Sequence, residues 1–205
     1  MNKKTRQVMM SSDKMDWRTP PEMLDIVRQI GPIGLDPCAP NDNNTGAKTF
    51  FTADDDGLQK SWAGHGLVFV NPPYGRALKP WMAKMAREGT QATEIVALVP
   101  VRTDTAWWQD NVSSARRVCF YRGRIKFLDV YQAGIEAWPP DTSDPAAAEY
   151  IYQKFTKNDL PVPAEAPSAE PAPFPTQFIY WGSNPERFEE VFMPHGIVIE
   201  PKERQ

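Results

Sequence analysis

The chain has few of the residues that metal, redox and membrane proteins need. It contains two cysteines and two histidines in 205 residues, and Cys38 and Cys119 lack the close spacing of a metal knuckle or a redox pair. Such sparse thiols favour a reducing, cytoplasmic setting. No apolar run is long enough to cross a bilayer, and residues 1–13 lack the apolar core of a secretion signal. We therefore predict neither a metal site nor a membrane span.

An excess of positive charge is also missing, since the net charge is −3. The acidic balance comes from one region: residues 131–175 hold seven acidic and two basic side chains, a charge of −5, so the rest of the chain carries +2. A mildly basic body is compatible with nucleic-acid binding through a local patch.

The length suits one domain. We expect a flexible tail at residues 1–15 and a single domain over residues 16–205, interrupted by a proline-rich acidic insertion at about residues 131–175. That insertion holds nine prolines and is typical of an extended surface segment. It could be a solvated loop, or it could face DNA or a partner.

Short apolar runs alternate with helical patterns along the rest of the chain. The Thr-Pro-Pro-Glu sequence at residues 19–22 predicts a helix start, with Thr19 as the capping residue and Pro20 in the first turn. Helices are also predicted after residues 78, 103 and 184. The predicted strands are residues 33–36, 67–70, 94–99, 118–121, 177–181 and 197–199. This alternation predicts an α/β sandwich with a mostly parallel central sheet and helices on both faces.

The most informative motif is Asn71-Pro72-Pro73-Tyr74, directly after the predicted strand at residues 67–70. An aromatic amino group is a poor nucleophile, because its lone pair is delocalised into the ring. The Asn71 side-chain oxygen and the next backbone carbonyl can hold such a nitrogen as it becomes positively charged. The prolines stiffen the loop, and Tyr74 offers a face for an extruded base. A plain turn is the alternative, but the strand before the motif and the aromatic residue after it favour catalysis.

This motif resembles the (Asp/Asn/Ser)-Pro-Pro-(Tyr/Phe/Trp) loop of amino-methyltransferases. The wider pattern resembles the phage-type DNA N6-adenine methyltransferase family, which is related to the Dam enzymes. The blocks that carry the resemblance are residues 16–21, 35–37, 55–58 with Trp62, 71–74, 99–105, 123–127 and 172–175. Their order along the chain is more specific than any one block except the catalytic one.

The resemblance implies a Rossmann-like fold that uses S-adenosylmethionine to methylate adenine N6 in double-stranded DNA, in a protein encoded by a phage or prophage. It implies that residues Thr19, Pro20 and Pro21 close over the methionine end of the cofactor. Asp36 would lie beside the cofactor, and Asp56 would accept from its adenine amino group. Asp36 could equally be a turn cap, and Asp54 and Asp55 compete with Asp56. The chain departs from the usual pattern because no glycine-rich turn follows the first strand.

Arg122, Arg124 and Lys126 belong to the densest basic stretch, and we expect them to contact DNA phosphates. A merely solvated charged face is the alternative.

Two other functions remain open. The same catalytic loop serves protein glutamine amides and RNA adenine, although such protein methyltransferases generally show the glycine-rich turn. A non-catalytic DNA-binding module of the same fold is the second, and the intact Asn71 and Tyr74 argue against it.

Overall fold

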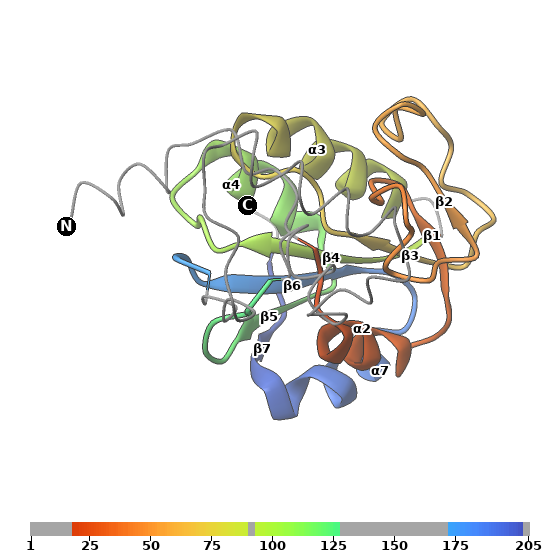
Figure 1. The fold of residues 1–205 in the computed structure, drawn as a ribbon. Helices are drawn as coiled ribbons and strands as arrows, with labels where there is room; N and C mark the ends of the chain where they lie inside the picture. Colours follow the sequence, from red (N-terminus) through yellow and green to blue (C-terminus); the bar gives the residue numbers. More distant parts are fainter. Residues whose placement is uncertain (1–17, 90–92, 128–171, 203–205) are drawn as a thin grey trace, which may run out of the picture.

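The computed structural model describes residues 18–89, 93–127 and 172–202 (Figure 1). The expected tail at residues 1–15 and most of the predicted insertion lie outside these ranges. Ala172 and Phe174, at the end of that insertion in the sequence prediction, are buried in the domain. The Ala172 amide donates to the Ile125 carbonyl at 2.9 Å, so the described segments on either side of residues 128–171 lie side by side.

The described residues form a mixed sheet of seven strands in the order β2-β1-β3-β4-β6-β5-β7. Strands β2, β1, β3 and β4 pair in parallel, whereas the pairings of β4 with β6, β6 with β5, and β5 with β7 are antiparallel. The parallel sheet that the sequence predicts is therefore confined to one half. The strands are β1 (Ile33–Asp36), β2 (Thr49–Phe50), β3 (Leu67–Val70), β4 (Glu94–Pro100), β5 (Arg117–Tyr121), β6 (Thr176–Trp181) and β7 (Gly196–Ile199).

Helices cover both faces of the sheet, as the sequence predicts. The helices α2 (Pro21–Arg28) and α7 (Pro185–Phe192) lie on one face, and α3 (Leu78–Gly89) and α4 (Ala106–Asn111) lie on the other (Figure 1). Each face has its own apolar core, with Phe178 and Phe188 in one and Trp62 and Met82 in the other. Strands β3 and β6 are buried along their whole length because they serve both cores. No helix among the described residues is long and apolar enough to span a membrane.

The prediction that Thr19 caps the first helix was wrong. Pro20 is the N-cap residue, no side chain caps this end, and Pro21 takes the first helical position. The Pro20 carbonyl accepts from the amides of Met23 and Leu24, while the Thr19 hydroxyl contacts another part of the chain. The sequence prediction also missed β2, because a two-residue strand has no periodicity to detect.

A close backbone contact fixes the loop that follows β1. A Cβ atom on Gly57 would lie 1.9 Å from the Pro37 carbonyl oxygen, so only glycine fits. The Gly57 carbonyl also accepts from the buried indole N–H of Trp62 at 2.9 Å. The turn at Gly57 is thereby pressed against the backbone after Asp36.

We predict that Gly57→Ala lowers the free energy of unfolding by about 1–3 kcal/mol, because the added methyl group forces this backbone apart. Gly31→Ala is the matched control, since a Cβ atom there meets nothing within 4 Å. Urea denaturation of the two variants measures the difference. Equal stability of the two variants would show that the contact at Pro37 is not tight.

Candidate active site

The site lies where the direction of the chain through the sheet reverses. The chain passes from β1 to β2 on one side and then returns to form β3 on the other side of β1. Open α/β sheets bind ligands at such a point, outside the carboxyl ends of the strands. Asp36 ends β1 and Asn71 directly follows β3, so these two predicted site residues reach the same edge of the sheet.

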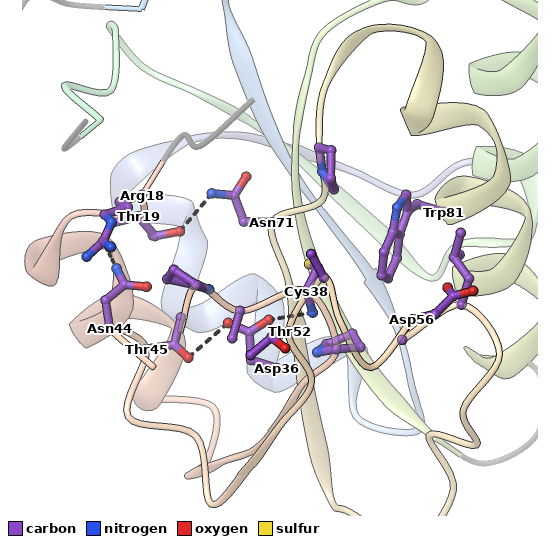
Figure 2. Close-up of a pocket in the computed structure, with 17 residues that line it drawn as sticks. Arg18, Thr19, Asp36, Cys38, Asn44, Thr45, Thr52, Asp56, Asn71 and Trp81 are labelled. Atoms are coloured by element: carbon purple, nitrogen blue, oxygen red, sulfur yellow. Dashed lines mark hydrogen bonds between the residues drawn. The ribbon is translucent and has the colours of Figure 1, made fainter. Parts of the chain in front are cut away.

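A cavity of about 270 Å³ opens at this edge (Figure 2). Segments that follow β1, β2 and β3 form its walls, together with the residues before α2 and one side chain of α3. The lining residues are Arg18, Thr19, Asp36–Pro40, Asn44, Thr45, Thr52, Ala53, Asp56–Leu58, Asn71, Pro73 and Trp81. The structure thus brings together the predicted residues Thr19, Asp36, Asp56, Asn71 and Pro73, whereas Pro72 and Tyr74 do not line the cavity. Pro20 and Pro21 do not line the cavity, although they adjoin Thr19 in the chain.

Asp36 is buried in the floor of the cavity, with 3% of its surface exposed. Its carboxylate accepts from the Cys38 amide at 3.0 Å and from the Thr45 hydroxyl at 2.9 Å. Burial raises the pKa of Asp36 to about 6, and the hydrogen bonds from Cys38 and Thr45 offset only part of that rise. Asp36 thus caps the turn at Cys38 and also lines the cavity, and its position beside a ligand stays a prediction.

Cys38 lies between the two strand ends. Burial, followed by the nearby Asp36 charge, raises the pKa of the Cys38 thiol well above its usual value. The thiol is therefore protonated at neutral pH and is a poor nucleophile. Cys38 contributes surface to the cavity rather than covalent chemistry.

Asn71 is held by a residue that is distant in the sequence. Its Nδ2 donates to the Thr19 hydroxyl oxygen at 3.0 Å (Figure 2). Asn44 Nδ2 donates to the Thr19 carbonyl at 3.2 Å, so the loop after β1 holds the same segment.

Tyr74 packs inside the domain. Only 9% of its surface is exposed, and its hydroxyl donates to the Leu98 carbonyl at 3.3 Å. Its ring meets Phe127 and Phe174 edge to face, at centroid distances of 6.1 and 5.6 Å. A base that stacks on Tyr74 therefore requires neighbouring side chains to move, and the stacking role stays a prediction.

Asp56 lies at the far end of the cavity, beside Trp81 (Figure 2). Its backbone adopts a φ of +52°, which is uncommon for a residue other than glycine. Of its two competitors, Asp55 closes a turn by accepting from the Thr52 amide at 2.9 Å. Asp56 lines the cavity, whereas Asp54 and Asp55 do not.

The predicted DNA-contacting residues lie on one segment that adjoins the Asn-Pro-Pro-Tyr loop. Arg122, Arg124 and Lys126 are exposed, whereas the alternate residues Ile125 and Phe127 are buried. Because Phe127 packs against Tyr74, the three cations extend from the same region as the Asn-Pro-Pro-Tyr loop.

Several cavity residues escaped the sequence prediction. Asn44 and Thr45 belong to a polar run that is typical of a turn, and the position of Trp81 predicts a core residue of a helix. Arg18 is an isolated cation, 11% exposed, that pairs with Asp42. Within the described part of the chain, no three His, Cys, Asp or Glu side chains gather as a metal site would require.

Comparison with known proteins identifies the family. A family model described as DNA N-6-adenine-methyltransferase (Dam) matches residues 6–164. The chain belongs to the Dam family. Its β6, α7 and β7 lie beyond the matched residues of the Dam model.

A DNA N-6-adenine-methyltransferase of Escherichia phage T1 is similar to this Dam-family chain. The two are 26% identical over 103 residues, which cover 50% of this chain and 42% of the T1 protein. The chain thus spans less than half the length of that relative. No solved structure matches the chain. The family model and the phage relative are both described as DNA N-6-adenine-methyltransferases.

Proposed function

We propose that this protein transfers a methyl group from S-adenosylmethionine to the N6 amino group of adenine in double-stranded DNA. The observation that carries the proposal is the convergence of Asn71 and the buried carboxylate of Asp36 on one cavity at the strand ends. The family match supports the same chemistry. The reversal between β1 and β3, with helices on both faces, supports a Rossmann-like methyltransferase fold.

The donor set of the cavity suits this cofactor, which is zwitterionic at its methionine end and aromatic at its adenine end. Arg18, which lines one end of the cavity, would hold the carboxylate, and Asp36 would hold the ammonium group. Trp81 and Leu58 supply apolar surface at the other end, where Asp56 would accept from the adenine amino group. When bound there, the cofactor supplies an electrophilic methyl group.

The chain's own contribution to catalysis is to hold the nucleophile. We assign the Asn71 side-chain oxygen and the Pro72 carbonyl to the target amino group, where they stabilise positive charge as the nitrogen becomes tetrahedral. No general base with a shifted pKa is needed to activate the amino group before the methyl transfer. A base inside a duplex cannot reach this site, so the target adenine must be extruded.

The acceptor class is tested by transfer of a labelled methyl group to three substrates offered separately: unmethylated duplex DNA, RNA, and protein that contains accessible glutamine. We expect label in the DNA alone. Label in RNA or protein would show that the substrate is not DNA. Tight cofactor binding with no transfer to any acceptor would favour a non-catalytic module.

For DNA binding, we propose that Arg122, Arg124 and Lys126 contact phosphates. We predict that Arg124→Gln combined with Lys126→Gln weakens duplex binding and reduces the slope of log K against log salt by about 2, since each lost contact removes about 0.9. Lys202→Gln is the control: Lys202 is exposed and follows β7, whose pairing with β5 places residue 199 beside Val118, away from Arg122. Titrations at several salt concentrations measure the slope. An unchanged slope would show that these cations form a solvated face and do not contact DNA.

A further inference from the structure

The contact between Thr19 and Asn71 joins two predicted sites. The family resemblance assigns Thr19 to the cofactor, and the motif chemistry assigns Asn71 to the target nitrogen, but a 3.0 Å hydrogen bond connects them (Figure 2). Thr19 is 2% exposed, so water does not compete strongly for its hydroxyl group. Asn71 and Thr19 are 52 residues apart, and the contact depends on how α2 is placed against the end of β3.

The backbone around Thr19 is fixed from several directions. The Asn44 side chain binds the Thr19 carbonyl, and Asp42, two residues earlier in the same loop, pairs with Arg18. On the other side, Pro20 restricts the backbone and leads directly into α2. The Thr19 hydroxyl is therefore presented to Asn71 from a rigid support.

The orientation of the Asn71 amide matters because its two ends differ. Its oxygen can accept a hydrogen bond from an amino group, whereas its nitrogen carries two N–H donors and would repel that group. In the structure the nitrogen end is turned to Thr19, so the oxygen end is directed away from the Thr19 hydroxyl group. A preorganised acceptor contributes more to catalysis than one that must first rotate into place.

We propose that Thr19 is a positioning residue: its hydroxyl oxygen accepts from Asn71 Nδ2 and thereby holds the amide oxygen ready for the target amino group. This inference rests on the proposed function. Thr19 acts through Asn71 and does not bind the cofactor directly, which differs from the role that the family resemblance implies.

Thr19→Val tests the proposal, because it keeps the shape and removes the hydroxyl group. We expect the single-turnover rate of methyl transfer at saturating cofactor and DNA to fall about three- to tenfold, the effect of one neutral hydrogen bond. The dissociation constant for S-adenosylmethionine should stay within twofold. Thr19→Ser restores the hydroxyl group and should recover the rate to within twofold of the wild type.

The same substitution in the Asn71→Asp background separates positioning from general packing. A carboxylate presents an acceptor whichever way it turns, so Thr19→Val should cost less there than in the wild-type background. Equal costs in the two backgrounds would overturn the proposal. So would a Thr19→Val variant that binds the cofactor more weakly but transfers at the wild-type rate when saturated, since Thr19 would then be a cofactor contact.

A readout independent of activity comes from the Asn71 side-chain amide in the NMR spectrum, assigned by its loss in Asn71→Asp. We expect the chemical shifts of the Asn71 amide protons to differ from the wild type in Thr19→Val and to match the wild type in Thr19→Ser. Unchanged shifts in Thr19→Val would contradict the hydrogen bond itself. A wild-type protein that shows these shifts but methylates no DNA would instead overturn the proposed function, and the positioning role with it.

Discussion

Asn71→Ala is expected to reduce the single-turnover rate of methyl transfer by about a hundred- to a thousandfold. The substitution removes one preorganised acceptor from the target nitrogen, a loss worth about 2.7–4 kcal/mol of transition-state stabilisation. Cofactor affinity should stay within a few-fold, because Asn71 is assigned to the acceptor and not to the methyl donor. Rapid-quench measurement at saturating S-adenosylmethionine and DNA gives the rate, and equilibrium titration gives the affinity.

Asn71→Asp is the matched control, since it keeps the side-chain length and an acceptor oxygen. We expect it to retain far more activity than Asn71→Ala. If Asn71→Ala kept most of the wild-type rate with both substrates saturating, the assignment of Asn71 to the target nitrogen would be wrong.

Asp36→Asn is expected to raise the dissociation constant for S-adenosylmethionine about ten- to a hundredfold. The amide keeps the size of the side chain and can still accept from Thr45 or Cys38, but it lacks the charge that would pair with the cofactor's ammonium group. A hydrogen bond to a charged group contributes about 1.5–3 kcal/mol, which corresponds to this range.

The raised pKa of Asp36 gives this prediction a pH signature. A cationic ligand binds the ionised carboxylate, so wild-type affinity should be constant between about pH 6 and pH 7. Below pH 6 it should fall by up to about tenfold per pH unit. The Asp36→Asn variant should lack this dependence. Calorimetric titration between pH 4.5 and pH 8 measures the cofactor affinity of the wild type and of Asp36→Asn. If the two proteins bound the cofactor equally well at neutral pH, Asp36 would be a turn cap alone.

Stability without cofactor should depend on Asp36 in the opposite sense. Because its folded-state pKa of about 6 lies above the ordinary value of 3.8, the protonated form favours folding. This contribution is complete below about pH 4 and is lost as the pH rises through 6. The Asp36→Asn variant should therefore be more stable than the wild type at pH 7, by a margin that shrinks towards pH 4.

The sequence predicted two strands, β1 and β3, with their exact bounds. For β3 the reason is that four consecutive apolar residues end at the rigid Asn-Pro-Pro sequence. The antiparallel pairings of β6 and β7 depend on contacts between residues far apart in the chain, which a local pattern does not encode. The sequence therefore indicated the fold class and missed the mixed character of the sheet.

The predicted site residues converge for a similar reason. Asp36 ends one predicted strand and Asn71 directly follows another, and parallel strands place their carboxyl ends at one edge of a sheet. The bond between Thr19 and Asn71 was not predictable, since Thr19 precedes two prolines and a glutamate and so carries the pattern of a helix cap. Arg18 and Trp81 gave no local signal, because each reaches the cavity only through tertiary packing.

Isotope transfer tests most directly whether the methyl group reaches the N6 nitrogen of adenine. The protein is incubated with S-adenosylmethionine that carries a deuterated methyl group and with unmethylated duplex DNA, which is then digested to nucleosides and analysed by mass spectrometry. We predict trideuterated N6-methyldeoxyadenosine from the wild type. Under the same conditions, Asn71→Ala should form at least about a hundredfold less of this product. Label in cytosine, or no label in the DNA, would contradict the claim.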